Sequence, residues 1–183
     1  MKTKSETRRN FLKLRRDISP EIREKKSRRI CEKLEKFLRE KKFEKILFFA
    51  PSEFEPNIFP VLEKFLRAKK TVALPFCKSR SKFIAKKISE ISEISKRNFS
   101  FFEPHENCAE ISKNEIDAVL MPAVAIDEFK NRVGMGGGAY DRFLENFAGA
   151  KIAVVFDFQI SKIEFQFCES HDVRCDAVIF DEN

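Results

Sequence analysis

Short, continuous apolar runs recur along this sequence and constrain its fold more than any other feature. They are KILFFAP (45–51), TVALPF (71–76), DAVLMPAVAI (117–126), KIAVVF (151–156) and DAVIF (176–180). Apolar runs of this kind are typical of strands that are buried on both faces of a sheet. The segment KFIAKKI (82–88) is interrupted by lysine and predicts a more exposed strand.

Segments with helical periodicity precede and separate these strands. Apolar residues at helical spacing predict helices over residues 5–17, 20–41, 57–70 and 140–148. Ser19 and Pro20 favour the start of the second helix, because serine caps a helix N-terminus well and proline fits the first turn. Strands that alternate with helices predict an α/β fold. We expect a three-layer α/β/α, Rossmann-like arrangement with a mainly parallel sheet, preceded by N-terminal helices.

Length, composition and charge narrow the class of protein further. A chain of 183 residues suits one domain, so residues 1–183 are expected to form a single unit. Hydrophobic residues make up 43% of the chain and charged residues 36%, a balance typical of globular domains. The net charge of +7 keeps a basic nucleic-acid-binding module as an alternative. The sequence has no zinc-ligand spacing, arginine-rich tail or aromatic ribonucleoprotein motif, so we expect no nucleic-acid partner.

The cysteines and the lack of long apolar runs indicate the environment of the protein. No apolar run approaches the roughly 20 residues that a membrane span requires, so no membrane partner is expected. The five cysteines, at positions 31, 77, 108, 168 and 175, form no CxxC pair. This pattern predicts free thiols in a cytoplasmic protein, which we expect to be a monomer or a weak dimer.

The segment NRVGMGGGAYDRF (131–143) holds four of the five glycines of the chain, at positions 134, 136, 137 and 138. Successive glycines let backbone N–H groups converge on an anion, and a helix that begins after the loop adds positive charge there. Arg132 and Arg142 flank the loop and could supply further charge. The segment predicts a phosphate-binding loop, with a flexible surface turn as the alternative.

The glycine segment differs from the two most familiar nucleotide-binding motifs. It is not a P-loop, because no Lys-Ser or Lys-Thr follows the glycines. Gly134, Gly136 and Ala139 do fit the G-x-G-x-x-A fingerprint of dinucleotide-binding folds, and Asp157 could contact a ribose. However, seven residues, DEFKNRV, separate the preceding strand from these glycines. An oxidoreductase that binds NAD(P) through this loop remains an alternative.

The stretch DAVLMPAVAIDEFKNRVGMGGGAYDRFL resembles the signature of 5-formyltetrahydrofolate cyclo-ligases, also called 5,10-methenyltetrahydrofolate synthetases. In that family a strand ending in P-G-V-A-F-D precedes R-L-G-x-G-x-G-Y-Y-D-R. Other segments resemble the family in the expected order, namely the Lys4 and Arg8 spacing before LRRDISPE, SEFEP, the EP of FFEPHEN, and FDFQ followed by ESHDVRCDAVI. Ala139 departs from the pattern, because it stands where the family has its first tyrosine.

The resemblance implies an ATP- and Mg²⁺-dependent ligase that converts 5-formyltetrahydrofolate to 5,10-methenyltetrahydrofolate and releases ADP and phosphate. In this reaction the formyl oxygen attacks the γ-phosphate, and N10 of the folate then closes on the activated carbon as phosphate leaves. Phosphoryl transfer depends mostly on positioned cations, N–H donors and Mg²⁺ rather than on a covalent nucleophile. ATP and 5-formyltetrahydrofolate are therefore the expected partners, with Mg²⁺ as cofactor.

The same resemblance implies roles for individual residues. The expected ATP-binding residues are Lys4, Arg8, Arg132, Gly134, Met135, Gly136, Gly137, Gly138, Ala139 and Tyr140. The expected magnesium ligands are Asp141 and Asp172. The expected catalytic residues are Arg132, Tyr140 and Asp127, of which Asp127 could orient Arg132 or hold a metal-bound water. The expected substrate-binding residues are Phe48, Phe49, Glu53 and Tyr140. The Glu53 carboxylate suits the amino and ring N–H donors of a pterin.

Overall fold

The computed structural model describes residues 3–97, 102–167, 169 and 172–182 of the chain. Its helices are α1 (Lys4–Asp17), α2 (Pro20–Glu40), α3 (Phe59–Arg67) and α4 (Ala139–Phe143), and its 3-10 turns are η1 (Ile91–Glu93), η3 (Lys113–Glu115) and η4 (Asp157–Gln159). The main sheet has six strands, which in spatial order are β11 (Ala177–Ile179), β9 (Ala150–Val154), β6 (Ala118–Pro122), β1 (Lys45–Leu47), β2 (Thr71–Ser79) and β3 (Lys82–Ile88). Neighbouring strands are parallel, except that β3 is antiparallel to β2. The predicted mixed α/β class with a mostly parallel sheet is therefore confirmed.

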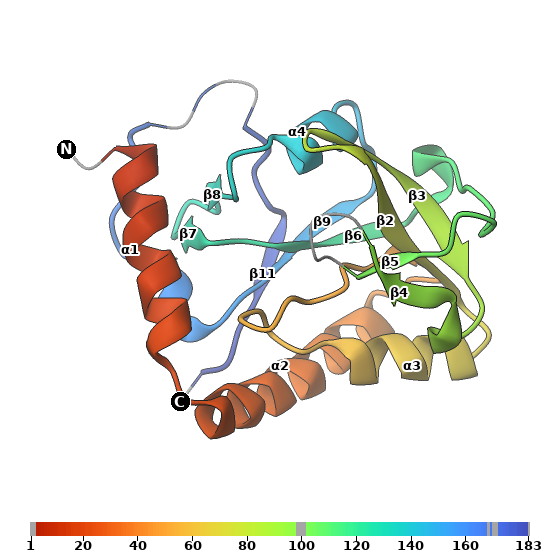
Figure 1. Cartoon of the computed structure of the whole chain (residues 1–183). Helices are drawn as coiled ribbons and strands as arrows, with labels where there is room; N and C mark the ends of the chain where they lie inside the picture. The colour runs from red at the N-terminus through yellow and green to blue at the C-terminus, as the bar shows by residue number, and fades with distance from the viewer. Residues whose placement is uncertain (1–2, 98–101, 168, 170–171, 183) are drawn as a thin grey trace.

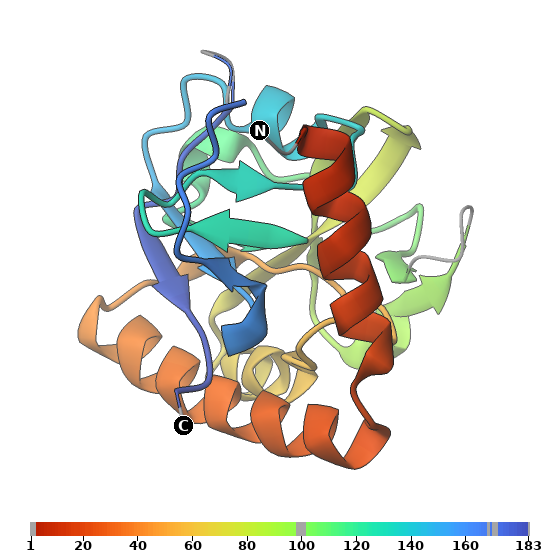
Figure 2. The same ribbon diagram turned by 90° about the vertical axis from the view of Figure 1, so that its left-hand side faces the viewer.

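Two small sheets complete the structure. One contains β10 (Ile160–Ser161), β7 (Ala125–Asp127) and β8 (Arg132–Val133), and the other contains β4 (Ile94–Lys96) and β5 (Phe102–Pro104). Helix α1 crosses beside β7 and β8 rather than lying on the main sheet (Figure 2).

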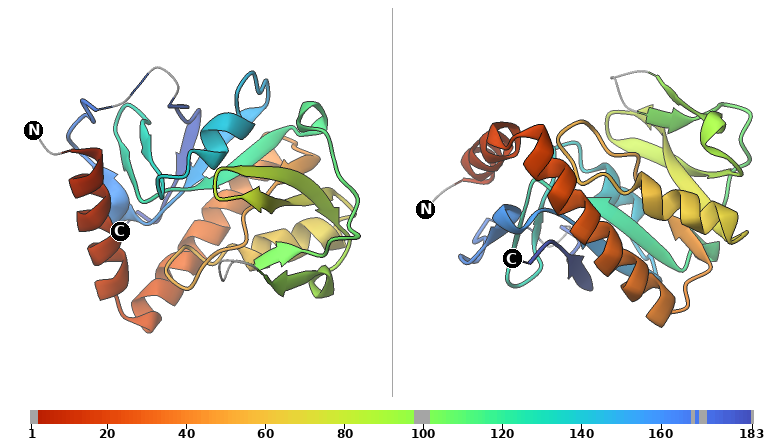
Figure 3. Two further views of the ribbon diagram at one scale, coloured as in Figure 1. Left: turned by 45° about the horizontal axis from the view of Figure 1, so that its top comes forward. Right: turned by 90° about the horizontal axis from the view of Figure 1, so that it is seen from below.

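The two faces of the main sheet are covered differently. Helices α2 and α3 lie side by side beneath one face, as Figure 1 and the view from below in Figure 3 show. The other face is covered largely by loop residues and by α4, which has only five residues. The predicted third helical layer is thus present only in this reduced form among the described residues. The helix predicted over residues 140–148 is correspondingly short, because it ends at Phe143.

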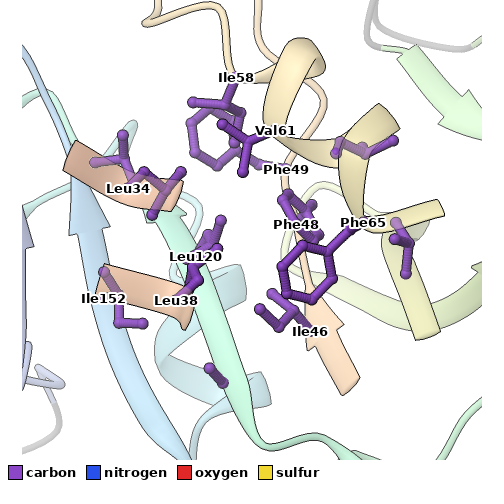
Figure 4. Close-up of a cluster of buried hydrophobic side chains, with 14 of the residues drawn as sticks. Leu34, Leu38, Ile46, Phe48, Phe49, Ile58, Val61, Phe65, Leu120 and Ile152 are labelled. Atoms are coloured by element: carbon purple, nitrogen blue, oxygen red, sulfur yellow. The ribbon is translucent and has the colours of Figure 1, made fainter. Parts of the chain in front are cut away.

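The larger hydrophobic cluster joins α2 and α3 to the sheet (Figure 4). Leu34 and Leu38 of α2 are almost completely buried, and Val61 and Phe65 of α3 belong to the same cluster on this face of the sheet. Phe48 is fully buried and packs edge-to-face on Phe65, with ring centroids 5.5 Å apart. This cluster supports the strand ends from which the loops of the candidate site emerge.

The start of α2 is as predicted. The Ser19 side chain accepts a hydrogen bond from the backbone N–H of Ile22 at 3.3 Å, and Pro20 occupies the first turn. Helix α1 has a similar start that the sequence analysis missed, because Thr3 and Glu6 cap it reciprocally. These caps fix where α1 begins, and therefore where its basic side chains lie.

The apolar run at residues 117–126 is not one strand, as predicted, but two. It divides after Pro122 into β6 of the main sheet and β7 of the small sheet. The buried amide of Gln159 donates hydrogen bonds to the carbonyl oxygens of Ala123 and Val124, at 2.6 and 3.0 Å. This side chain satisfies backbone groups that a continuous strand would have paired, so it stabilises the break.

Lys26 is expected to contribute strongly to stability. Its ammonium group contacts Asp157 at 2.8 Å and the fully buried Asp181 at 2.5 Å. Lys26→Met would leave both carboxylates without this cation, so we expect the free energy of unfolding in urea to fall by about 3 kcal/mol. The exposed Arg28–Glu24 pair on the same helix provides the control, since Arg28→Met should change it by less than about 1 kcal/mol. Equal effects of the two substitutions would contradict this role of Lys26.

The described cysteines agree with the expectation of free thiols. Cys31, Cys77, Cys108 and Cys175 are free thiols, and Cys168 lies outside the described residues. No helix in the described part of the chain is both long and apolar enough to cross a membrane.

Candidate active site

A cavity of about 380 Å³ lies where the glycine segment, α1 and the β2–β3 hairpin meet. The glycine loop (residues 134–138) connects β8 to α4 and runs between α1 and the hairpin (Figure 1). All twelve expected ATP-binding and metal-binding residues line this cavity, together with the expected substrate-binding residue Phe49. The twelve are Lys4, Arg8, Arg132, Gly134, Met135, Gly136, Gly137, Gly138, Ala139, Tyr140, Asp141 and Asp172. The volume falls within the range typical of small-molecule sites. The alternative of a flexible surface turn does not account for this arrangement.

The glycines of the loop are required by close approach and by backbone geometry. A Cβ atom on Gly137 would lie 2.5 Å from the carbonyl oxygen of Arg80 in the hairpin turn. Gly138 has φ of 64°, in the left-handed region that favours glycine. Within the part of the chain that the structure describes, the backbone N–H groups of residues 134–138 donate no hydrogen bond to other protein groups. They are therefore available to an anionic ligand.

Arg142 clamps the loop onto the hairpin instead of facing a ligand. Its guanidinium group donates from Nε to the carbonyl oxygen of Ser81 at 2.8 Å and from Nη2 to the carbonyl oxygen of Gly137. The helix that follows the loop is too short to add the macrodipole charge that the sequence suggested. Positive charge at this site must come from side chains.

Lys4 and Arg8 of α1 supply part of that charge. Arg8 donates from Nε to the carbonyl oxygen of Gly134 at 2.7 Å, which fixes the loop against α1. The ammonium group of Lys4 contacts both carboxylate oxygens of Asp172 at 2.7 Å. The expectation that Lys4 and Arg8 reach one site from successive helical turns is consistent with this geometry.

Arg132 occupies the base of the cavity and is only 8% exposed. Its Nη2 atom donates to Asp141 at 2.8 Å, and its Nε atom is buried with no hydrogen-bond partner among the described residues. Its guanidinium carbon lies 5.7 Å from the centre of the Tyr140 ring. Arg132 is therefore a desolvated cation, held in place, with donor capacity left for a ligand.

Tyr140 lies between Arg132 and the hairpin. Its ring packs edge-to-face on Phe83, with centroids 5.1 Å apart. Burial, and after it the negative charge of Glu55, raises the pKa of the Tyr140 phenol well above its usual value. The hydroxyl group therefore stays protonated at neutral pH and can donate a hydrogen bond, but it is a poor base.

Three of the expected site residues lie elsewhere. Asp127 is 2% exposed, and its oxygens accept hydrogen bonds from the backbone of Phe129, Asn131 and Phe165 and from the Asn131 side chain. Asp127 therefore closes its own turn and does not line the cavity, and among the described residues it makes no hydrogen bond to Arg132. Phe48 belongs to the core, because its ring packs on Phe65.

The third is Glu53, which lies on a neighbouring groove of about 900 Å³. The glutamate that lines the glycine-loop cavity is Glu55, two residues further along. Glu55 contacts the buried Arg15 at 3.5 Å and accepts a hydrogen bond from the backbone of Ser52. The loop between β1 and α3 thus turns the second glutamate of SEFE, not the first, toward the cavity.

Other residues that line the cavity were missed by the sequence analysis. They are Arg15, Glu55, Cys77, Arg80, Phe83, Phe102 and Glu103. They come from α1, the loop between β1 and α3, the hairpin and β5, and no single motif links them along the chain. These residues come together around the cavity only when the chain is folded, so the sequence alone does not identify them.

The acid required by the dinucleotide-binding alternative is not at this site. Asp157 forms an ion pair with Lys26, and it does not line the cavity. The NAD(P) alternative therefore loses its ribose contact.

Asp141 and Asp172 are the carboxylates with the chemistry to hold a magnesium ion here. Asp141 also accepts a hydrogen bond from the backbone N–H of Val173 at 3.2 Å, which brings the two acidic segments together. The described residues contain no group of three or more potential ligands of a metal ion. Two carboxylates nevertheless fit Mg²⁺, which proteins often bind through one or two acidic side chains plus phosphate oxygens of the substrate.

A concave site with a glycine-rich loop, buried arginines and several carboxylates, beside a mostly parallel sheet, is typical of enzymes that bind phosphorylated small molecules. Residues 1–181 match the model of the 5-formyltetrahydrofolate cyclo-ligase family. The chain belongs to this family of enzymes.

Individual relatives agree with this assignment. The chain is 29% identical over 140 residues to 5-formyltetrahydrofolate cyclo-ligase of Escherichia coli K12, which covers 73% of this chain and 76% of that protein. It is 37% identical over 82 residues to the enzyme of the same name from Haemophilus influenzae, covering 44% of each chain.

Solved structures show the same fold. The structure of 5,10-methenyltetrahydrofolate synthetase from Aquifex aeolicus superposes with a TM-score of 0.85 and 25% sequence identity, covering 98% of this chain and 90% of that one. The synthetase from Mycoplasma pneumoniae gives a TM-score of 0.78 at 23% identity, covering 96% and 97%, and supports the fold.

Proposed function

We propose that this protein converts 5-formyltetrahydrofolate to 5,10-methenyltetrahydrofolate in an ATP- and Mg²⁺-dependent reaction that releases ADP and phosphate. The observation that carries the proposal is the cavity formed by the glycine loop and Arg132. This cavity is lined by the glycine loop, whose backbone N–H groups donate to no other group of the described residues, and by the desolvated guanidinium group of Arg132. Phosphate oxygens are the ligands that such donors favour.

The triphosphate of ATP binds along the glycine loop in this proposal. Backbone amides of residues 134–138 contact phosphate oxygens, and Lys4 and Arg8 add positive charge from α1. The Nε atom of Arg132 donates to the transferred phosphoryl group, because it is a buried donor with no partner among the described residues. Asp141 accepts a hydrogen bond from Nη2 of this guanidinium group and so fixes its orientation.

The folate binds at the end of the cavity formed by Phe49, Phe102 and Glu55. The formyl oxygen attacks the γ-phosphorus atom, and the bond from that phosphorus to the bridging oxygen of ADP breaks. N10 then attacks the formyl carbon, the carbon–oxygen bond to phosphate breaks, and N10 loses its proton. Tyr140, protonated and placed beside Arg132, donates a hydrogen bond to an oxygen of the transferred group.

Asp141 and Asp172 would hold Mg²⁺ together with phosphate oxygens of ATP. The ion would neutralise charge on the triphosphate, as it does in other phosphoryl-transfer enzymes. Lys4 and Arg132 pair with these carboxylates and would add positive charge beside the same phosphate groups.

Ligand-dependent thermal stability tests the proposed binding partners. We expect Mg-ATP and 5-formyltetrahydrofolate each to raise the melting temperature, since a ligand at 100 times its Kd stabilises the folded state by about 2.7 kcal/mol. NADP and a short oligonucleotide serve as controls and should have no effect. Stabilisation by NADP but not by Mg-ATP would contradict the proposal and favour the oxidoreductase alternative.

A further inference from the structure

Glu103 is a buried acidic residue that is not among the site residues expected from the sequence. It lies in β5, which packs against β2, and is only 3% exposed. It lines the same cavity as the glycine loop. Its Oε1 atom is buried and has no hydrogen-bond partner within the described residues. An unpaired buried carboxylate oxygen is costly unless a ligand donates to it.

The immediate neighbour of Glu103 is a thiol rather than a cation. Burial, followed by a hydrogen bond to the Glu103 carboxylate, raises the pKa of Cys77 to about 12. The thiol therefore stays protonated, and as a weak donor it satisfies the carboxylate only in part. The free acceptor capacity of Glu103 faces the cavity from the hairpin side.

A hydrogen-bond donor without a partner among the described residues also lines this cavity. Arg15 is 4% exposed, and its guanidinium group donates from Nε to the carbonyl oxygen of Phe54 and contacts Glu55. Its Nη1 atom is buried without a partner among the described residues. The cavity wall also carries the aromatic rings of Phe49 and Phe102. A ligand that pairs with both unpaired atoms and packs on these rings needs a flat ring that carries N–H donors and a carbonyl acceptor.

We propose that Glu103 accepts hydrogen bonds from the N–H donors of the pterin ring of 5-formyltetrahydrofolate, while Arg15 donates to the pterin carbonyl oxygen. This inference rests on the proposed function, and it assigns to Glu103 the recognition role that the sequence assigned to Glu53. The 2-amino-4-oxopyrimidine edge of a pterin carries an amino group, a ring N–H and a carbonyl, which match these unpaired atoms in kind. The glycine loop keeps the phosphates of ATP at the other part of the cavity.

Glu103→Gln tests this role through binding of separate ligands. The substitution keeps the size of the side chain but removes its charge and half of its acceptor capacity. We expect the Kd of 5-formyltetrahydrofolate, measured by calorimetry without ATP, to rise about 10- to 100-fold, as for the loss of hydrogen bonds to a charged group. The Kd values of Mg-ATP and of p-aminobenzoylglutamate, which lacks the pterin, should change less than about twofold.

Stability provides the readout that separates recognition from a structural role. Because Glu103→Gln replaces a buried carboxylate that the Cys77 thiol satisfies only in part, the melting temperature should stay equal or rise. Glu106→Gln is the matched control, since Glu106 lies three residues further along the same segment with a side chain that is 81% exposed. This control should leave all three Kd values and the melting temperature unchanged.

The possible outcomes separate this inference from the proposed function. Unchanged folate affinity in Glu103→Gln, with a wild-type protein that binds folate, would overturn the role of Glu103 and leave the proposed function intact. Parallel loss of folate and ATP affinity with a lower melting temperature would show that Glu103 is structural and would also overturn it. A wild-type protein that binds no 5-formyltetrahydrofolate would overturn both.

Discussion

Arg132→Ala is expected to lower kcat about 100-fold or more, because it removes a positioned cation from the charge that develops during phosphoryl transfer. The guanidinium group is desolvated, held by Asp141 and left with an unpaired Nε donor, so water cannot easily replace it. The measurement is the steady-state rate of methenyl product formation at saturating ATP and folate. Arg132→Lys should recover only part of the activity, since an ammonium group lacks the planar, forked donors of arginine.

The control for Arg132 is Arg9→Ala. Arg9 is exposed on α1 next to Arg8, and it does not line the cavity. Its replacement should leave kcat within about twofold of the wild type, as is usual for exposed positions without special contacts. If Arg132→Ala retained full kcat while folding normally, Arg132 would have no role in the chemical step.

Gly137→Ala is expected to lower kcat/KM for ATP at least tenfold. The new methyl group would meet the carbonyl oxygen of Arg80 at 2.5 Å, and this is a backbone atom that cannot rotate away. The loop or the hairpin must therefore shift, and a misplacement of about 1 Å can cost up to 100-fold in rate. The measurement is the dependence of the rate on ATP concentration at saturating folate.

Met135→Ala provides the comparison within the same loop. The Met135 side chain is 64% exposed, and its truncation adds no atom to the crowded contact with the hairpin. We expect a change in kcat/KM for ATP of less than about threefold, as for other exposed positions. Similar kinetics of the Gly137 and Met135 variants would refute the idea that the hairpin sets the shape of the phosphate-binding loop.

The sequence predicted those features that depend on local patterns. The strands of the main sheet appear as continuous apolar runs because both faces of the sheet are covered, and Ser19 with Pro20 marks the start of α2. The glycine segment was found because few structures need four glycines so close together. Lys4 and Arg8 were placed at the site by helical spacing combined with the family resemblance.

The features that the sequence missed depend on contacts between distant segments. The break at residues 122–125 is stabilised by Gln159, which lies far along the chain. Asp127 looks like a site residue because it ends an apolar run, but the turn that follows it uses its carboxylate. Glu53 and Glu55 are equivalent in the sequence, and only the path of the loop decides which one faces the cavity.

The roles of Arg15 and Glu103 could not be assigned from the sequence for a related reason, although Glu103 belongs to the EP pair of FFEPHEN that resembles the family. Basic residues are abundant in the first helices, and an acidic residue beside a proline is common in loops. Arg15 and Glu103 each have a buried polar atom with no hydrogen-bond partner among the described residues, and this can be seen only in the folded protein. Such groups indicate where a ligand completes the hydrogen bonding that the protein leaves open.

The most direct test of the account is to incubate the purified protein with 5-formyltetrahydrofolate and Mg²⁺, with and without ATP, and to follow the absorbance of the methenyl product. ADP and phosphate are quantified in the same samples. We predict methenyl product only when ATP is present, with ADP and phosphate formed in equal amounts to it. Product formation without ATP, or ATP hydrolysis without methenyl product, would contradict the proposal that the glycine-loop cavity couples phosphoryl transfer to ring closure.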